Sequence, residues 1–233
     1  MNANLPTQLP LTLNWQDYAT FDNYFSGENT QAVSWLKNIA RGEGEHYIYL
    51  YGGSGSGLSH LLQACCQMAA DQGRTAAYVP LMRSGFVPEI LDGLETLDLI
   101  CIDDIQAIAS QRAWEEKIFH LYNQLLARSG NLIVASQASI KQLPWQLSDL
   151  ASRLMAGVVF QIKPLSDEQK AEALRMRAQM RGLRLPPEVT HYLLSRFSRD
   201  MHALFHTLEK LDYASLVAQR KLTVPFVKEV LAK

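Results

Sequence analysis

Five apolar runs of strand length recur along the first two thirds of the chain. They span residues 46–51, 75–80, 97–103, 131–136 and 158–163. Segments with helical spacing separate most of them, notably residues 58–72 and 113–128. Near-continuous apolar strands that alternate with helices are typical of a parallel sheet covered on both faces. The pattern therefore predicts an α/β fold with a five-stranded parallel sheet sandwiched by helices.

The strand pattern ends at Pro164, and only helical spacing follows. Ser166 and Gln169 match a capping box that opens a helix running to Gly182. Two further apolar stripes begin at Val189 and Leu204, and a short helix is expected over residues 225–231. Residues 164–233 are therefore predicted to form a small all-α helical lid domain after an α/β domain of residues 15–163.

The first 14 residues differ from the rest. They hold no charged side chain and two prolines, Pro6 and Pro10, so we expect an extended tail rather than a helix.

Composition narrows the class of protein. The 233 residues are 48% hydrophobic and 19% charged, with 22 Lys+Arg against 23 Asp+Glu. No apolar run approaches membrane-spanning length, and the amino terminus does not look like an export signal. Three cysteines make no disulfide framework, which favours the cytoplasm. The net charge of −1 argues against a protein that binds nucleic acid by bulk charge.

A glycine-rich segment follows the first strand and precedes the first long apolar helix. Residues 52–59, GGSGSGLS, match the phosphate-loop template GxxxxGK[ST] at every fixed position except the lysine, which is Leu58 here. Backbone N–H groups of such a loop and the helix amino terminus bind phosphate oxygens. The expected nucleotide-binding residues of this segment are Gly53, Ser54, Gly55, Ser56, Gly57, Leu58, Ser59 and His60.

The missing lysine bears on hydrolysis more than on binding. Losing one fixed donor to the transferring phosphoryl group costs about 3 kcal/mol at the transition state, on the order of a hundredfold in rate. Backbone contacts to the inner phosphates do not need that lysine. The sequence therefore favours a protein that holds ADP, or another nucleoside diphosphate, and hydrolyses triphosphates poorly.

An acidic pair ends the third apolar run. Asp103 is placed to hold Mg²⁺ through water, together with the hydroxyl of Ser59. Asp104 falls where many phosphate-loop ATPases have a Glu that polarises the attacking water. Because Asp is one methylene shorter, its reach to that water is in question.

The order of these elements resembles the AAA+ ATPases, and more closely the bacterial replication initiator DnaA. Residues 21–25, with Asn23 and Tyr24, look like the segment that lines the base pocket in that family. The resemblance implies that Ser136 is a first sensor facing the γ-phosphate and that His202 replaces the usual second-sensor arginine. Residues 149–154 resemble the box whose arginine, here Arg153, reaches a neighbouring subunit's nucleotide.

The amino-terminal tail adds a second resemblance, to DnaA-homologous regulatory proteins. Its Gln8, Leu9, Leu11 and Leu13 look like a peptide that binds the DNA polymerase III β sliding clamp. This likeness implies a regulator that is tethered to the DNA-loaded clamp and stimulates hydrolysis of ATP bound to DnaA by lending Arg153 in trans. Contact with DNA would then be indirect, and nucleotide could control a homo-oligomer.

Less specific interpretations compete with these. Arg153 alone reads as a solvated or ion-paired surface residue, and an apolar tail can pack back on its own domain. The alternative function is an autonomous AAA+ ATPase similar to a helicase loader. It predicts turnover by the isolated chain; Leu58 and the tail argue against it.

Overall fold

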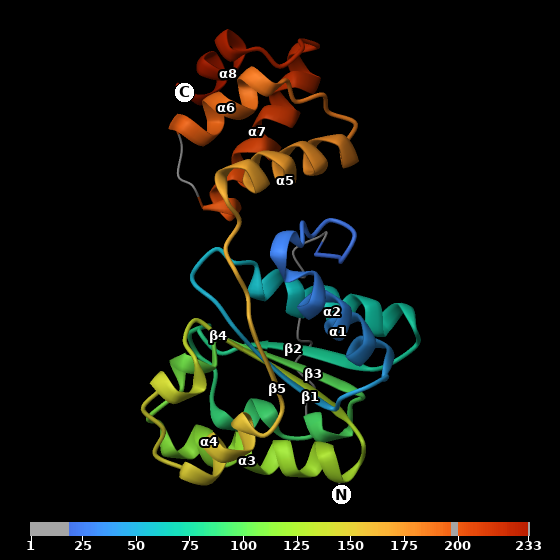
Figure 1. The fold of residues 1–233 in the computed structure, drawn as a ribbon, viewed down its shortest axis with the longest axis vertical. Helices are drawn as coiled ribbons and strands as arrows, with labels where there is room; N and C mark the ends of the chain where they lie inside the picture. The colour runs from blue at the N-terminus through green and yellow to red at the C-terminus, as the bar shows by residue number, and fades with distance from the viewer. Residues whose placement is uncertain (1–18, 197–199, 233) are drawn as a thin grey trace, which may run out of the picture.

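A computed structural model describes residues 19–196 and 200–232 (Figure 1). The tail of residues 1–14, with the expected clamp-binding residues Gln8, Leu9, Leu11 and Leu13, lies outside the described residues.

The centre of the first domain is a parallel sheet, as the apolar runs predict. Its strands are β1 (Tyr47–Tyr51), β2 (Ala76–Pro80), β3 (Leu99–Asp103), β4 (Asn131–Ser136) and β5 (Val158–Gln161), in the order β2-β3-β4-β1-β5. Every strand pair is parallel. Tyr51 lies opposite Ser136, so β1 and β4 end together. Parallel α/β sheets bind ligands beyond these carboxyl ends.

Helices cover both faces of this sheet, as Figure 1 shows. On one face lie α1 (Thr30–Arg41) and α2 (Leu58–Asp71), and on the other α3 (Arg112–Ala127) and α4 (Ser148–Met155). Alternate residues of β1 belong to two separate cores: Ile48 and Leu50 pack with α1 and α2, whereas Tyr47 and Tyr49 pack with α3 and α4. This period of two explains why the strand is apolar along its whole length.

Short 3₁₀ turns connect these elements. They are η1 (Gly27–Asn29), η2 (Pro88–Leu91), η3 (Leu94–Thr96), η4 (Ile105–Ala107) and η5 (Ile140–Gln142). The third strand begins at Leu99 rather than at residue 97, since η3 and the hydrogen bonds of Asp98 to Thr75 occupy the preceding residues.

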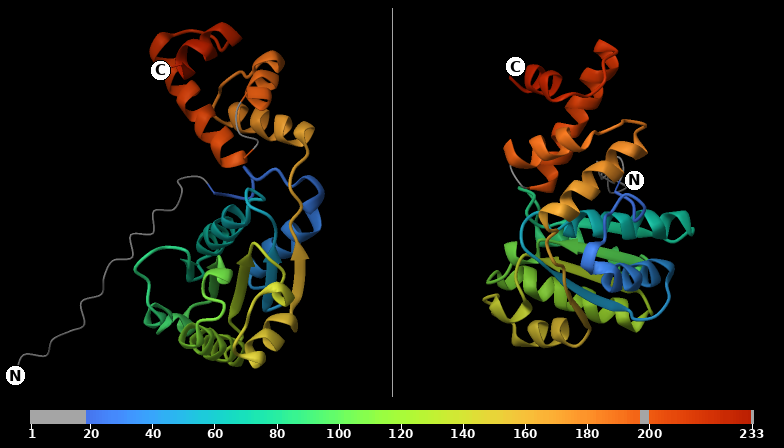
Figure 2. Two further views of the ribbon diagram at one scale, coloured as in Figure 1. Left: turned by 90° about the vertical axis from the view of Figure 1, so that its left-hand side faces the viewer. Right: turned by 45° about the horizontal axis from the view of Figure 1, so that its top comes forward.

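The lid is a bundle of α5 (Asp167–Met180), α6 (Pro187–Arg196), α7 (Met201–Ala218) and α8 (Val224–Leu231), shown from two further sides in Figure 2. The predicted capping box is present, because the Ser166 hydroxyl accepts from Gln169 N and the Gln169 side chain accepts from Ser166 N. Leu174, Leu193 and Leu208 belong to the separate core of this bundle. Within residues 19–196 and 200–232, no helix has the length and hydrophobicity of a transmembrane span.

Candidate nucleotide-binding site

A pocket of about 470 Å³ lies where the glycine-rich loop faces the lid. All eleven residues predicted to bind nucleotide line it: Asn23, Tyr24, Gly53, Ser54, Gly55, Ser56, Gly57, Leu58, Ser59, His60 and His202. Asp103 and Asp104 line it as well. The structure thus brings together residues from the entry to the α/β domain, from the end of β3 and from the lid.

The loop between β1 and α2 has the backbone shape of a phosphate-binding turn. Gly55 and Gly57 take the left-handed conformation, with φ of 76° and 90°. The close approach of Gly52 to Ile162 O leaves no room for a Cβ, which would lie 2.7 Å from that oxygen. Because α2 begins at Leu58, the N–H groups of its first turn have no intrahelical acceptor and are available to an anion.

One polar atom of this loop has no hydrogen-bond partner within the described part of the chain. The Ser56 hydroxyl is buried and has no hydrogen-bond partner among the described residues, although Ser56 lines the pocket. A buried hydroxyl without a partner costs free energy. The hydroxyl oxygen lies against Gly52, where a Cβ would be 2.8 Å from it.

Leu58, at the position of the phosphate-loop lysine, packs into the core. Its side chain is only 8% exposed and belongs to the core formed with α1 and α2. Among the described residues that line the pocket, none is Lys or Arg, whereas Asp103, Asp104 and Asp200 contribute carboxylates. Arg199 lies outside the described residues. The described lining is therefore acidic, apart from the histidines His60 and His202.

Tyr24 and His60 form an uncharged side of the pocket. The Tyr24 hydroxyl donates to Ser56 O at 3.4 Å, and the two rings lie 5.5 Å apart. Burial raises the pKa of Tyr24 to about 12. Burial also lowers the pKa of His60, whose Nε2 lies 2.9 Å from Thr20 O. Both side chains are therefore suited to contact a neutral part of a ligand, such as a base.

The carboxylate at the end of β3 is held by several donors. Asp103 is 2% exposed and accepts from the Tyr78 hydroxyl at 2.7 Å and from Asp104 N at 2.9 Å. Burial raises the pKa of Asp103, and the hydrogen bonds from Ser59 and Tyr78 oppose that rise. Ser59 and Asp103 both line the pocket, and their hydroxyl and carboxylate oxygens are the ligand atoms that Mg²⁺ prefers.

Ser136, the expected first sensor, is not among the residues that line the pocket. It is fully buried, and its hydroxyl donates to Gln106 Oε1 at 3.0 Å, while the next residue, Gln137, lines the pocket. Gln106 also donates from Nε2 to Asp104 Oδ1 at 2.8 Å. Gln106 therefore connects Asp104 with Ser136. Apart from its place two residues after Asp104, nothing in the sequence indicated a role for Gln106 in the site.

The lid contributes side chains that the sequence did not suggest. Asp200 caps α7, because its Oδ2 accepts from Ala203 N at 3.0 Å. Its Oδ1 lies 2.7 Å from the place of a Cβ on Gly55, so it contacts the phosphate loop directly. Phe205, one turn further along α7, lines the pocket too.

Arg153 lies apart from this pocket. It is exposed in the last turn of α4, on the sheet face opposite α1 and α2, and it does not line the pocket. Among the described residues, no carboxylate lies within ion-pair distance of its guanidinium. A guanidinium placed in this way is available to another molecule.

The phosphate loop, the acidic end of β3 and the helical lid together define a P-loop protein of the AAA+ class. The sequence profile of the bacterial DnaA ATPase domain matches residues 15–161, and that of the Hda lid domain matches residues 167–231. The chain therefore belongs to the DnaA-related AAA+ family, with a lid of the Hda type. This membership confirms the predicted family and supports nucleotide binding and a role in DNA replication.

Solved structures have a similar fold. Domain III of the Thermotoga maritima replication initiation protein DnaA is 21% identical, with a TM-score of 0.77 over 92% of this chain and 95% of that chain. AMPPCP-bound DnaA from Aquifex aeolicus is 24% identical, with a TM-score of 0.72 over 84% of this chain and 65% of that chain. The Thermotoga maritima RuvB branch migration motor is 14% identical, with a TM-score of 0.70 over 94% of this chain and 72% of that chain. These similarities confirm the predicted AAA+ fold.

Proposed function

We propose that this protein regulates initiation of chromosome replication by holding a nucleotide in its own pocket while lending Arg153 to ATP bound by DnaA. One observation carries the proposal: the exposed guanidinium of Arg153 lies away from a pocket whose described lining contains no Lys or Arg. A pocket of this kind suits binding, and a cation of this kind suits a reaction in a neighbouring molecule.

The nucleotide that fits best is ADP. Backbone N–H groups of the phosphate loop bind inner phosphates without a lysine. The carboxylates of Asp103, Asp104 and Asp200 disfavour the additional negative charge of a γ-phosphate. When bound, Mg²⁺ would neutralise phosphate charge, and Ser59 and Asp103 are the residues that would hold it.

The pocket of this chain is a poor place for hydrolysis. The side chain of Leu58 is packed in the core and cannot replace a lysine. Asp104 is shorter than the Glu that polarises the attacking water in many phosphate-loop ATPases, and its carboxylate accepts a hydrogen bond from Gln106. In this proposal the bound nucleotide is a structural ligand that fixes the lid against the α/β domain. The protein is then an activator of the DnaA ATPase rather than an efficient NTPase.

An arginine supplied by another molecule meets charge that develops only in the transition state. Such arginines accelerate phosphoryl transfer by ~10³–10⁵. The donor molecule needs only to place the guanidinium and hold it there. This is why a protein with an impaired pocket can still control hydrolysis.

A tether would bring the protein to its target. The tail residues Gln8, Leu9, Leu11 and Leu13 are proposed to bind the DNA polymerase III β sliding clamp, which raises the local concentration near DNA. Contact with DNA is then indirect, through the clamp. We also propose that the bound nucleotide controls whether the protein forms a homo-oligomer. We expect this activity in the cytoplasm.

The test uses DnaA loaded with ATP, clamp-loaded DNA and the full chain. Arg153→Ala is expected to abolish stimulated hydrolysis, to leave ADP affinity and clamp capture unchanged, and to leave the free energy of unfolding unchanged because the side chain is exposed. Arg128→Ala, at another exposed arginine of the same domain, is the matched control and keeps stimulation. Stimulation that survives Arg153→Ala would refute the assignment.

A further inference from the structure

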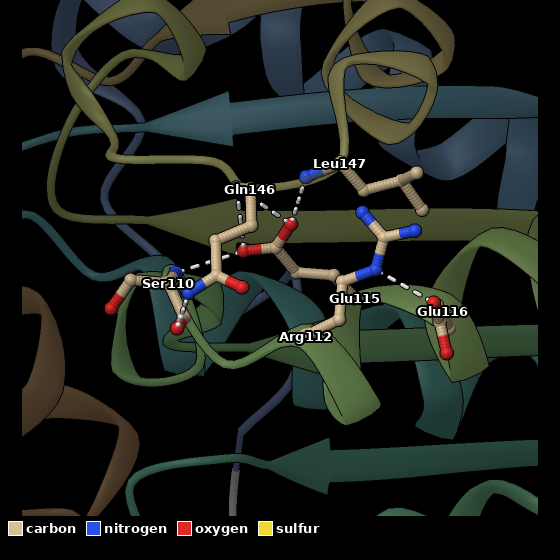
Figure 3. A network of polar contacts seen from close by, with 6 residues as sticks. All are labelled: Ser110, Arg112, Glu115, Glu116, Gln146 and Leu147. Atoms are coloured by element: carbon tan, nitrogen blue, oxygen red, sulfur yellow. Dashed lines mark hydrogen bonds and ion pairs between the residues drawn. The ribbon is translucent and has the colours of Figure 1, made fainter.

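A buried carboxylate joins three segments on the α4 side of the sheet (Figure 3). Glu115, in the first turn of α3, is 0% exposed. Its Oε1 accepts from Ser110 N at 2.8 Å, and its Oε2 accepts from Gln146 N at 2.9 Å and from Leu147 N at 2.6 Å. The side chain therefore holds the turn before α3 and the loop before α4 at one point.

Each of these partners is a backbone N–H group. A carboxylate offers only acceptors, so it matches the three donors, whereas a carboxamide would place its own N–H groups among them. A buried anion is tolerated only where its oxygens are hydrogen-bonded. The loop cannot shift without leaving both the carboxylate and its own N–H groups unpaired, and its position is fixed for that reason.

The loop held by Glu115 leads directly into the helix that carries Arg153. Leu147 is the N-cap residue of α4 (Ser148–Met155) and makes no side-chain capping bond. Arg153 lies six residues beyond Leu147, about 9 Å along the helix axis. Because α4 has only eight residues and buries only Leu150 and Leu154, the place where it begins largely decides where Arg153 lies.

A second hydrogen bond, at the protein surface, joins the loop before α4 to the turn before α3. The exposed side chain of Gln146 donates from Nε2 to Ser110 O at 2.6 Å. Ser110 has a φ of 73°, a conformation that non-glycine residues rarely adopt, so its turn is set by these contacts. The neighbouring residues Arg112 and Glu116 pair with each other on the surface of α3, and no hydrogen bond or ion pair of the described residues joins this pair to the loop (Figure 3).

We propose that Glu115 is a positioning residue that fixes the start of α4 and thereby the direction of Arg153. The consequence for DnaA rests on the proposed function; the positioning of α4 does not. The two can therefore be measured separately.

The structural test places spin labels at His120→Cys on α3 and Met155→Cys at the end of α4, both exposed positions. The native cysteines Cys65, Cys66 and Cys101 are all buried, so labelling is selective. In the parent chain we expect one narrow distance distribution. Glu115→Gln is expected to broaden or shift it.

Glu116→Gln is the control, since it makes the same chemical change at the next residue of α3, where the side chain is exposed and pairs with Arg112 rather than with the loop. It is expected to retain the parent distribution. An unchanged distribution in Glu115→Gln, or equal broadening in both variants, would overturn the proposal. Gln146→Ala, at an exposed residue, gives the same test if Glu115→Gln does not fold: broadening supports the proposal and a parent-like distribution overturns it.

The functional readout is stimulation of hydrolysis by ATP-loaded DnaA. A displacement of about 1 Å can cost on the order of a hundredfold in rate, so Glu115→Gln should lose tenfold or more, with ADP affinity of its own pocket unchanged. If Arg153→Ala keeps stimulation while the label distances respond to Glu115→Gln, the proposed function fails and the positioning role stands. If Arg153→Ala abolishes stimulation and Glu115→Gln changes neither readout, the positioning role fails alone.

Discussion

A methyl group on Gly55 tests whether contact between lid and phosphate loop shapes the nucleotide pocket. Gly55 has a φ of 76°, and a Cβ there would lie 2.7 Å from Asp200 Oδ1. Asp200 is not free to turn away, since its Oδ2 caps α7 through Ala203 N. Gly55→Ala must therefore displace the loop or break the cap.

The expected magnitude has two parts. A Cβ in the left-handed region costs about 1–2 kcal/mol, and loss of a helix cap costs about 1 kcal/mol. Gly73→Ala is a matched control, because Gly73 has a φ of 73° and a Cβ there would meet nothing within 4 Å. We expect Gly55→Ala to lower the free energy of unfolding by about 1 kcal/mol more than Gly73→Ala.

The assay compares ADP affinity by titration calorimetry alongside denaturant unfolding. Displacing Asp200 also displaces His202 and Phe205, which follow it on α7 and line the pocket. Gly55→Ala should therefore weaken ADP binding by about tenfold, equivalent to about 1.4 kcal/mol, while Gly73→Ala leaves it unchanged. Parent-like affinity in Gly55→Ala would refute the role of this contact.

Three further predictions concern the tail, the metal and acid stability. Replacing Gln8 and Leu9 by Ala should abolish capture by the clamp in a pull-down and leave ADP affinity unchanged. Chelating Mg²⁺ should weaken ADP binding by about tenfold or more in the same calorimetric assay, because the described lining is acidic. Hydrogen bonds from Thr75 lower the pKa of Asp98 below its usual 3.8. Their stabilisation is present above about pH 4 and is lost as pH falls through the lowered pKa; Thr75→Val should flatten that acid limb in unfolding experiments.

Local patterns were sufficient for most of the fold. The runs at β1 and β4 are nearly continuous in apolar residues because both faces of the sheet are covered, and their alternation with helical segments predicted a parallel sheet. Ser166 and Gln169 identified the start of α5 through a capping box that needs only four consecutive residues. The glycine pattern of residues 52–57 likewise indicated the loop, since left-handed backbone there requires glycine.

The contacts that complete the site are between residues distant in sequence. Nothing in the sequence around Asp200 indicates that it contacts Gly55, and Glu115 looks like one of several charged residues on an amphipathic helix. Ser136 was expected to face a phosphate, yet its hydroxyl is bonded to Gln106, so its role as a sensor stays a prediction. These contacts depend on how distant segments pack together, and a pattern within a short stretch of sequence does not predict them.

The decisive experiment measures whose ATP is hydrolysed. DnaA is loaded with labelled ATP, this protein is loaded with unlabelled ADP, and the two are mixed on clamp-loaded DNA while labelled ADP is followed. We predict rapid conversion of the DnaA-bound nucleotide and negligible turnover when this protein is given ATP alone. Persistence of ATP on DnaA, or comparable turnover by the isolated protein, would contradict the proposal that it lends an arginine to a reaction in another molecule.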